Sequence, residues 1–326
     1  MMANQDKTRD NYYFDSYAHI GIHEDMLKDK VRTLSYRDAV FKNPSLIQGK
    51  VVLDVGCGTG ILSMFAATAG ARKVYGVEKS GIVDFARQII EENNLQDKIT
   101  ILQGSIEEIT IPEKVDVIIS EWMGYALLYE SMLPSVILAR DRFMSPTGTM
   151  FPSRATMYFV AFEDSEYRQK KFDFWDNVYG LNFSPIKHWA LLEPLVDNVP
   201  QDNILTDTAV IANFNLNTVQ AHELIVNSDF ELHVSSDGTV HAFAIWFSVV
   251  FDGGDVDVVL TTSPYETSTH WCQSLFYVET PQETKKGDVI KGHIDMRPNE
   301  ANFRDQDLLI TYTIGENTFS QPYKMR

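Results

Sequence analysis

Residues 51–60 read VVLDVGCGTG, and this stretch decides the fold of the chain. Its first half is an apolar, mostly β-branched run that predicts a buried strand, and the glycines that follow at once predict a tight turn. Residues 61–69 are rich in small apolar side chains and end at Gly70, which predicts a helix. A strand, a glycine turn and a helix in this order indicate an α/β domain that binds a nucleoside-type ligand.

The next strand supports the same ligand class. Residues 73–78 read KVYGVE and end in Glu78, 24 residues after Asp54. In nucleotide-binding βαβ units, an acid in this place takes the hydroxyls of a ribose. The glycine spacing, G-x-G-x-G, departs by one residue from the dinucleotide fingerprint, and no second nucleotide-domain signature follows. We therefore expect a nucleoside-type ligand; a purely structural turn is the alternative.

Two further strands place acids at the same sheet edge. The run 99–102 predicts the third strand, and Glu107 follows it, either as a ligand-binding acid or as a solvated acid at a helix start. The run 115–119 predicts a buried fourth strand, which leads into residues 120–132, SEWMGYALLYESM. Parallel sheets bind ligands at the carboxyl ends of their strands, so both acidic segments belong near the site.

The segment 120–132 carries two glutamates, Glu121 and Glu130, with three aromatic residues between them. Carboxylates among aromatic side chains are costly unless a cation joins them. A guanidinium suits such a pair, because its planar fork matches a carboxylate through two parallel hydrogen bonds. The segment therefore predicts a guanidinium clamp; two unrelated surface charges are the alternative.

The α/β half ends near Phe151-Pro152. Before it, residues 128–143 have helical periodicity broken once at Pro134, and residues 146–148 predict a turn.

The second half is rich in short β-branched runs separated by turn residues, which predicts a β-sandwich or barrel. The expected strands are 155–162, 240–250, 256–261, 275–278, 289–296 and 308–314. Residues 163–195 interrupt this pattern with a charged lead-in and six large aromatic residues, which we expect to be exposed. Large apolar patches on a surface usually mark interfaces, so this segment predicts a dimerisation arm; a hairpin packed on its own barrel is the alternative. The six are Phe172, Phe174, Trp175, Tyr179, Phe183 and Trp189.

Residues 11–33 place aromatic and apolar side chains at helical spacing, with His23, Asp29 and Arg32 among them. An aromatic helix that also carries polar groups is expected to form a lid over a ligand, whereas a plain core stripe is the alternative. We therefore divide the chain into a helical cover, 1–33, a nucleoside-binding domain, 34–151, and a β-rich domain, 152–326.

Composition narrows the function classes. The chain has 326 residues, a net charge of −17 and a pI near 4.8, which argues against non-specific binding of nucleic acid and favours basic partners. Its two cysteines form no disulfide framework, and its eight histidines show no zinc-site spacing, so we expect no metal. No apolar run reaches the roughly 20 residues that span a bilayer. We expect no membrane association and a cytoplasmic and nuclear protein.

Four stretches resemble the motifs of type I protein arginine methyltransferases, in the family's order. They are the tyrosine motif 13–17, YFDSY, the cofactor motif 52–60, the double-glutamate loop 120–130 and the threonine-histidine-tryptophan loop 269–271. The resemblance runs from about residue 11 to the end of the chain. It implies a Rossmann-like S-adenosylmethionine-dependent methyltransferase domain followed by a β-barrel-like domain that carries a dimerisation arm.

The resemblance also assigns roles by position. In the family, the arginine at Arg32 binds the cofactor's carboxylate, the acid at Glu78 binds its ribose, and the acid at Glu107 lies near its adenine. The full cofactor set is Tyr17, His23, Met26, Arg32, Asp54, Gly56, Gly58, Glu78 and Glu107. The catalytic set, a substrate clamp and a histidine–aspartate pair, is Glu121, Glu130, His270 and Asp29. The substrate set is Tyr13, Met132 and Trp271.

The implied reaction transfers methyl groups from S-adenosylmethionine to peptidyl arginine and leaves S-adenosylhomocysteine. Arg/Gly-rich proteins and histone tails are the expected substrates, and mono- and asymmetric dimethylarginine the expected products. The proton leaves through Glu130 or through the His270–Asp29 pair, and the sequence favours neither. We expect a homodimer, with a higher oligomer as a further option. The alternatives are a catalytically silent paralogue that acts as a regulatory scaffold for an active enzyme, and a small-molecule methyltransferase.

Overall fold

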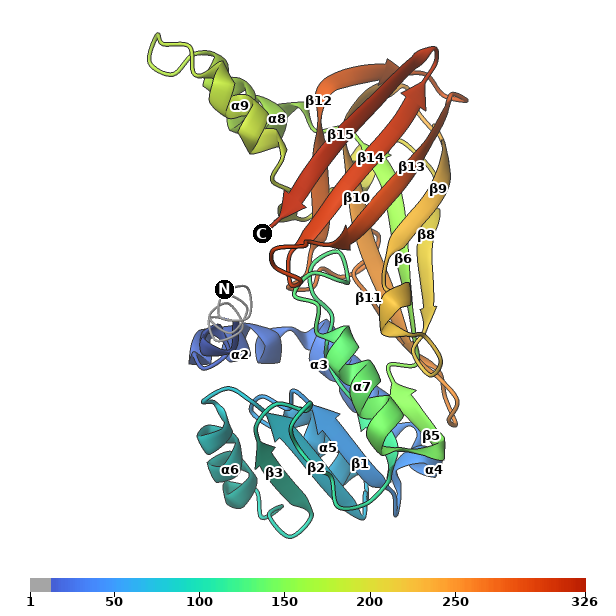
Figure 1. Ribbon diagram of the computed structural model, residues 1–326. Coiled ribbons are helices and arrows are strands. Elements are labelled where there is room, and N and C mark those ends of the chain that lie inside the picture. The colour runs from blue at the N-terminus through green and yellow to red at the C-terminus, as the bar shows by residue number, and fades with distance from the viewer. Residues whose placement is uncertain (1–12) are drawn as a thin grey trace.

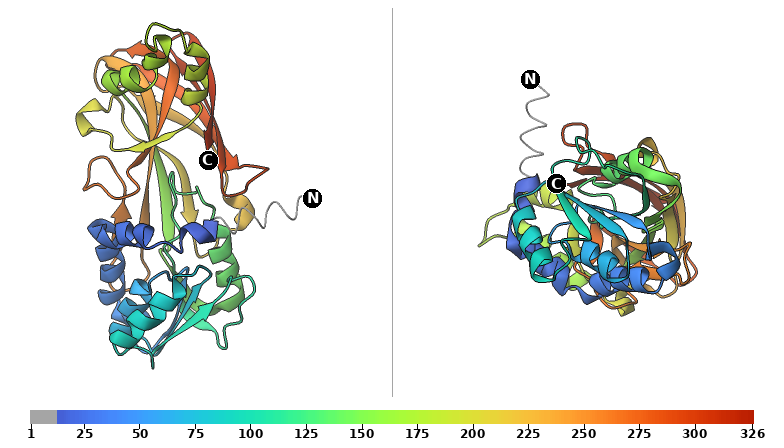
Figure 2. Two further views of the ribbon diagram at one scale, coloured as in Figure 1. Left: turned by 90° about the vertical axis from the view of Figure 1, so that its left-hand side faces the viewer. Right: turned by 90° about the horizontal axis from the view of Figure 1, so that it is seen from below.

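The computed structural model describes residues 13–326, so residues 1–12 of the expected cover lie outside the described part. Two bodies are stacked on each other, an α/β body and a β-rich body (Figure 1). Helices α2 (Ile20–Lys28) and α3 (Lys30–Phe41) lie on the side of the α/β body that faces the β-rich body. Figure 2 shows the same stacking from the side and from below.

The α/β body is built on one parallel sheet in the order β3-β2-β1-β4-β5. The central strand β1 is buried along its whole length, because both of its faces are covered. The chain order reverses between β1 and β4, and such a switch point opens a ligand crevice at the carboxyl ends of the strands. The predicted Rossmann-like fold is confirmed. Its strands are β1 (Val51–Val55), β2 (Lys73–Glu78), β3 (Ile99–Gln103), β4 (Val115–Ile119) and β5 (Met144–Phe151).

Helices flank this sheet, and one of them begins later than predicted. The helix expected over 128–143 is α7, which starts at Leu133. Pro134 lies in its first turn, where the missing N–H has no intrahelical partner to lose, so the proline opens the helix and does not interrupt it. The remaining helices of this body are α4 (Pro44–Ile47), α5 (Ile61–Thr68) and α6 (Val83–Glu92).

The prediction of a separate turn at residues 146–148 was wrong, because these residues lie inside β5. Val115 pairs with Met144, but Val117 pairs with Thr149, so the intervening residues of β5 form an irregularity in the ladder. The proline and glycine are tolerated there because β5 is an edge strand of its sheet.

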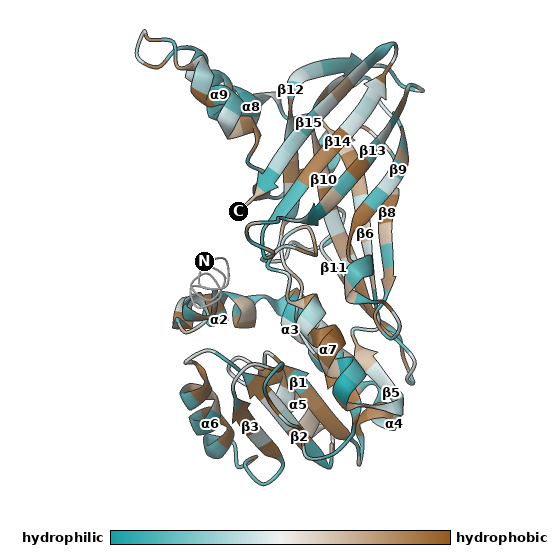
Figure 3. Cartoon of the chain, in the orientation of Figure 1, coloured by the Kyte–Doolittle hydropathy of each residue, from teal (hydrophilic) through white to brown (hydrophobic). Residues whose placement is uncertain are grey.

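The β-rich body consists of two antiparallel sheets with an aromatic core between them. One sheet has the order β7-β12-β10-β6-β8, with β11 added to β10, and the other has the order β15-β14-β13-β9. Phe159 and Phe243 stack with ring centroids 5.0 Å apart, and Tyr312 from the opposite sheet meets Phe243 edge-on at 4.9 Å. Figure 3 shows mixed hydropathy along these strands and a more uniformly hydrophobic parallel sheet. The predicted barrel-like domain is confirmed.

The β-rich body contains strands that the sequence did not predict. Four strands were missed: β7 (Leu195–Asp197), β8 (Ala209–Asn215), β9 (Val226–His233) and β15 (Asn317–Met325). The predicted ones are β6 (Arg154–Phe162), β10 (Gly238–Phe251), β11 (Val258–Thr261), β12 (Gln273–Thr284), β13 (Val289–Pro298) and β14 (Gln306–Ile314).

The segment 163–195 forms an arm that projects from the barrel (Figures 1 and 2). It contains α8 (Ser165–Lys171), a 3₁₀ turn η1 (Asp173–Asp176) and α9 (Ser184–Leu191). The expectation of six exposed aromatic residues holds for only part of the set. Phe172 is buried against Tyr277 and anchors the arm, Trp175 and Phe183 are half-buried, and the other three are exposed.

Candidate active site

A cavity of about 700 Å³ opens at the carboxyl edge of the parallel sheet. The α2–α3 segment, the loop after β4 and loops of the barrel complete its walls. Fifteen of the sixteen residues that the sequence analysis assigned to the site line this cavity. They are Tyr13, Tyr17, His23, Met26, Asp29, Arg32, Gly56, Gly58, Glu78, Glu107, Glu121, Glu130, Met132, His270 and Trp271.

The glycine turn after β1 lines one end of the cavity. Gly58 has φ +52° and donates its backbone N–H to Oε2 of Glu78 over 2.9 Å. A Cβ at Gly58 would meet the His23 ring at 3.2 Å, so the turn and α2 approach each other closely. The other oxygen of Glu78 accepts the N–H of Ser80 over 2.7 Å, which fixes the acid at the end of β2.

Asp54 is the one assigned site residue that does not line the cavity, because its side chain is fully buried. Its Oδ2 accepts a hydrogen bond from Ser63 over 2.7 Å, while its Oδ1 has no partner. Burial raises the pKa of Asp54 to about 7. Asp54 lies in β1 just before the glycine turn, and its hydrogen bond with Ser63 joins this strand to α5.

Glu107 follows β3, which is an edge strand of the parallel sheet. Its carboxylate accepts hydrogen bonds from the hydroxyls of Ser105 and, over 2.6 Å, of Ser135 at the start of α7. Met132 lies just before α7, and its Cε would be 2.5 Å from a Cβ at Gly56. The cavity therefore narrows between Met132 and the glycine turn.

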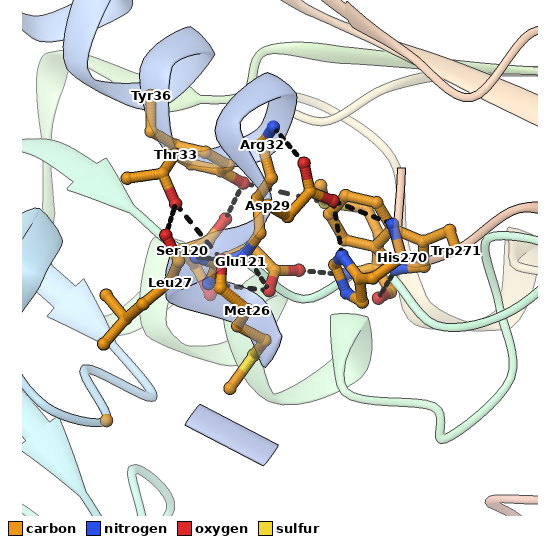
Figure 4. Close-up of polar contacts among 12 residues, drawn as sticks. Met26, Leu27, Asp29, Arg32, Thr33, Tyr36, Ser120, Glu121, His270 and Trp271 are labelled. Carbon is orange, nitrogen blue, oxygen red and sulfur yellow. Dashed lines mark hydrogen bonds and ion pairs between the residues drawn. The ribbon is translucent and has the colours of Figure 1, made fainter. Parts of the chain in front are cut away.

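Glu121 forms a buried ion pair that the sequence did not predict. Its Oε2 accepts from Nε of Arg32 over 3.0 Å and lies 2.9 Å from Nη2 (Figure 4). A third guanidinium nitrogen, Nη1, reaches the carbonyl of Met26 at 3.3 Å. Two carboxylates, one from the double-glutamate loop and one from a ligand, can share a guanidinium with five donors.

The backbone of the double-glutamate loop is held on two sides. The buried Tyr36 donates its hydroxyl to the carbonyl of Ser120 over 2.9 Å, and Nε1 of Trp271 donates to the carbonyl of Met123 over 2.8 Å. At Gly124 an added Cβ would lie 1.9 Å from the carbonyl oxygen of Tyr129, so this close turn requires glycine. Contacts within the protein therefore fix the conformation of this loop.

Glu130 faces the same cavity from the far end of this loop. The hydroxyl of Tyr17 donates to its Oε2 over 2.6 Å. Burial raises the pKa of Glu130, and the hydrogen bond from Tyr17 partly opposes that rise. The negative charge of Glu121 raises the pKa of Glu130 further, as expected for a second carboxylate nearby.

Asp29 joins the helical cover to the barrel. Its Oδ1 accepts the N–H of Arg32 and caps α3, while its Oδ2 accepts the N–H of His270 over 2.9 Å and lies 2.7 Å from Nδ1 of that ring (Figure 4). The aspartate–histidine pair assigned by resemblance is thus present as a contact between two segments 241 residues apart.

The residues fit the cofactor that the sequence implied. A sulfonium nucleoside of methionine carries a sulfonium, an ammonium, a carboxylate and a ribose. The acids of the cavity, with the unpartnered oxygen of Asp54 behind it, suit the cationic groups, and the guanidinium of Arg32 suits the carboxylate. Glu78 stands where a ribose is bound in such sheets.

Sequence reasoning missed two contributors to the site. Tyr36 carries no motif signal, although its burial is consistent with the apolar positions around it. Arg304 lines the cavity from the loop between β13 and β14, and no local pattern distinguishes that loop from an ordinary turn.

Comparisons with known proteins agree with this site. A family model described as the arginine methyltransferase oligomerization subdomain matches residues 153–317, and a methyltransferase-domain model matches residues 52–148. Protein arginine N-methyltransferase 1 of Schizosaccharomyces pombe is 51% identical over 312 residues, covering 95% of this chain and 92% of that protein. The Chlamydomonas reinhardtii protein of the same name is 46% identical over 326 residues, covering 98% and 94%.

A solved structure is also similar. It is the Trypanosoma brucei PRMT1 enzyme-prozyme heterotetrameric complex with AdoHcy, which matches with a TM-score of 0.94 and 45% identity, covering 96% of this chain and all of that one. The Arabidopsis thaliana protein arginine methyltransferase 10 matches with a TM-score of 0.90 and 33% identity over 96% of this chain. The chain belongs to the protein arginine N-methyltransferase family.

Proposed function

We propose that this protein is a type I protein arginine N-methyltransferase, which transfers methyl groups from S-adenosylmethionine to the guanidino nitrogens of peptidyl arginine. The observation that carries the proposal is the pair of carboxylates, Glu121 and Glu130, which face one cavity together with the nucleoside edge of a parallel sheet. Relatives at 44–51% identity over nearly the whole chain carry the name protein arginine N-methyltransferase 1.

The clamp prepares a poor nucleophile for attack. A guanidinium has a pKa above about 12 and a delocalised lone pair, so it must be polarised before it reacts. When bound, S-adenosylmethionine supplies an activated methyl group on a sulfonium sulfur. Glu121 and Glu130 hold the substrate guanidinium and draw its positive charge to one side, so the nitrogen that faces the methyl group gains lone-pair character. Such alignment can contribute roughly 7–11 kcal/mol in favourable systems.

Glu130 takes the proton that the methylated nitrogen releases. Burial raises the pKa of Glu130, which makes its carboxylate a stronger base than an exposed glutamate. The His270–Asp29 pair is the other route considered. Both oxygens of Asp29 already accept hydrogen bonds from the α3 N-terminus and from His270, which supports a structural role for that pair.

The products are monomethylarginine and asymmetric dimethylarginine. Met26, Tyr13 and Tyr17 crowd the cavity and restrict how a monomethylated arginine enters again, so the second methyl group goes to the same nitrogen.

The protein's substrates are Arg/Gly-rich segments and histone tails, which its net charge of −17 attracts from solution. Such substrates suit a cytoplasmic and nuclear protein. Among residues 13–326 there is no helix long and apolar enough to cross a membrane.

The protein works as a homodimer through its arm. The match to an oligomerization subdomain over residues 153–317 supports self-association, and exposed aromatic residues on the arm supply an apolar surface for it.

We also divide the chain into a cofactor-covering segment, 1–33, a cofactor domain, 34–151, and a substrate-binding barrel, 152–326. The two family models, which meet near residue 150, support the second boundary.

The alternatives have less support. A catalytically silent scaffold would be expected to lose a clamp glutamate, the glycine turn or the 269–271 loop, and this chain keeps all of them around one cavity. A small-molecule methyltransferase has no evident need for a second, β-rich domain of this size.

One experiment tests the proposed activity. The protein is incubated with S-adenosylmethionine and a glycine-arginine-rich peptide, and the products are analysed by fragmentation mass spectrometry. We expect added masses of one and two methyl groups on arginine, with the fragmentation pattern of asymmetric dimethylarginine. Products dominated by symmetric dimethylarginine would contradict the type I assignment, and an unmodified peptide would favour the silent scaffold.

The clamp itself is tested by Glu121→Gln and Glu130→Gln. Each change keeps the shape but removes the charge that polarises the guanidinium, so kcat and kcat/KM should both fall by about 100-fold or more, as for groups acting in the transition state. Glu78→Ala is the contrasting variant and should weaken cofactor binding first, measured by calorimetry. Near-normal turnover in either glutamine variant would contradict the clamp.

A further inference from the structure

The backbone at Glu130 and Ser131 has an unusual conformation. Their φ angles are +70° and +50°, in the left-handed region that non-glycine residues seldom occupy. A non-glycine residue in this region is strained, and it keeps such a conformation only where its surroundings hold it. The position of the clamp carboxylate of Glu130 therefore depends on whatever holds this backbone.

The loop between β13 and β14 holds it. Glu130 donates its N–H to the carbonyl of Arg304 over 2.9 Å, and Nη1 of Arg304 donates to the carbonyl of Glu130 over 2.8 Å. Beside this reciprocal pair, the hydroxyl of Ser131 donates to the carbonyl of Phe303 over 2.7 Å. Next to the loop, Nε2 of Gln306, the first residue of β14, donates to the carbonyl of Leu128 over 3.1 Å. A barrel loop thus grips the peptide units on both sides of the clamp glutamate.

This loop is braced internally. The side-chain oxygen of Asn299 accepts the N–H groups of Ala301 and Asn302 over 2.9 and 3.0 Å, and the N–H of Asp305 bonds to the carbonyl of Asn302 over 3.0 Å. A braced loop can impose a conformation on its neighbour, because little of the contact energy is lost to rearranging the loop itself.

Arg304 also covers the N-terminal segment. Its guanidinium carbon lies 3.8 Å from the centroid of the Tyr13 ring and 5.3 Å from that of Phe14. Tyr13 packs against Tyr17 with centroids 5.1 Å apart, and Tyr17 in turn donates to the carboxylate of Glu130. One side chain therefore contacts both the backbone of the clamp glutamate and the aromatic cover that bonds to its carboxylate.

We propose that Arg304 is a positioning residue for methyl transfer, which locks Glu130 in its left-handed conformation and latches the aromatic cover, residues 13–17, over the acceptor site. It acts through Glu130 and Tyr13, both of which it contacts. The inference rests on the proposed function for its effect on turnover, but the latch itself can be measured without any reaction. Because a guanidinium combines a planar stacking face with directed donors, lysine can replace only part of this role.

The test compares Arg304→Ala and Arg304→Lys with Arg297→Ala. Arg297 is the matched control, since it lies on the adjoining strand β13 and pairs with Asp295 at the surface, away from the cavity. Hydrogen exchange of residues 13–28 reports the latch, and steady-state kinetics on a glycine-arginine-rich peptide reports positioning. We expect Arg304→Ala to speed exchange of residues 13–28 and to lower kcat by about tenfold or more, since small misplacements of reacting groups can cost 100-fold. Arg304→Lys should recover part of both losses, and Arg297→Ala should match the parent protein.

A second variant, Tyr13→Leu, tests the latch independently of any folding defect that Arg304→Ala causes. Tyr13→Leu removes the ring under the guanidinium and leaves the barrel untouched, so it should speed exchange of the same segment. For exchange of residues 13–28, the effect of the double variant should be smaller than the sum of the two single effects, because both changes break the contact between the guanidinium and the Tyr13 ring. Unchanged exchange in Arg304→Ala and Tyr13→Leu would overturn the latch, as would faster exchange spread through the barrel with no excess in residues 13–28. A changed exchange pattern together with an inactive parent protein would count against the proposed function and leave the latch standing.

Discussion

Two effects shift the pKa of Glu130 in opposite directions. Burial raises its pKa above the ordinary value for glutamate, and the hydroxyl of Tyr17, 2.6 Å from Oε2, opposes that rise by stabilising the carboxylate. The clamp requires the carboxylate, so activity is present above this pKa and is lost as the pH falls through it. The acid limb of the kcat/KM profile should therefore lie above the range of an exposed glutamate.

Removing the Tyr17 hydroxyl tests this balance. Tyr17→Phe withdraws a hydrogen bond that lowers the pKa of Glu130, so the pKa rises and the acid limb moves to higher pH. The control is Tyr75→Phe, which removes a comparable tyrosine–glutamate bond, to Glu113 over 3.0 Å, outside the cavity. kcat/KM measured between pH 5 and 9 for both variants should shift only for Tyr17→Phe. A limb that stays in place, or moves to lower pH, would show that Glu130 does not control it.

The sequence could predict which residues gather at the site but not how they pair. Glu121, Glu130 and Arg32 were each assigned, and all three line the cavity. The ion pair between Arg32 and Glu121 was not foreseen, because the two come from segments whose approach depends on how α3 docks on the sheet. Arg304 was missed for the same reason, since its role comes from a contact between residues 174 positions apart.

Asp29, which lies between α2 and α3, connects the helical cover to the barrel. Asp29 caps α3 through Oδ1 and binds His270 through Oδ2. Asp29→Asn can keep the cap, because its amide oxygen still accepts the N–H of Arg32, but its amide nitrogen cannot accept from His270. Hydrogen bonds to charged groups contribute about 1.5–3 kcal/mol each, so we expect a loss of that order in the free energy of unfolding, measured in urea.

A comparison variant separates the two roles of Asp29. Asp29→Ala removes the cap as well and should lose about 1 kcal/mol more than Asp29→Asn. If Asp29→Asn is as stable as the parent protein, the contact with His270 does not fasten the cover.

At the level of elements, apolar runs were recognised and alternating edge strands were not. The buried strands β1, β4 and β10 were all predicted, because they carry continuous apolar runs. In contrast, β8 and β9 alternate with polar residues, and β15 contains Pro322, which suits an edge strand but weakens the local pattern. Such strands form because a neighbour pairs with them, which a local window of sequence does not reveal.

The whole molecule presents an arm whose apolar surface has no cover within the described chain. Tyr179 is 99% exposed and Trp189 is 64% exposed, while Phe172 is buried and fixes the arm to the barrel. Lys187 pairs with Asp173 over 2.7 Å and Asp176 over 2.8 Å, which joins α9 to the 3₁₀ turn and keeps the arm in shape. A rigid arm with an exposed aromatic face is well suited to a two-fold contact, in which each subunit offers the same surface and the assembly closes.

Replacing residues 175–189 by a short glycine-serine linker should therefore convert the proposed homodimer into a folded monomer, measured by light scattering. We expect cofactor affinity and turnover to fall sharply as well, because the arm of one subunit would steady the cover, residues 13–28, of the other. The control is Val210→Lys, an exposed apolar residue on β8, which should leave the mass and the activity of the dimer unchanged. A monomeric deletion variant with full activity would show that the arm does not complete the site, and a deletion variant that remains dimeric would place the interface elsewhere on the barrel.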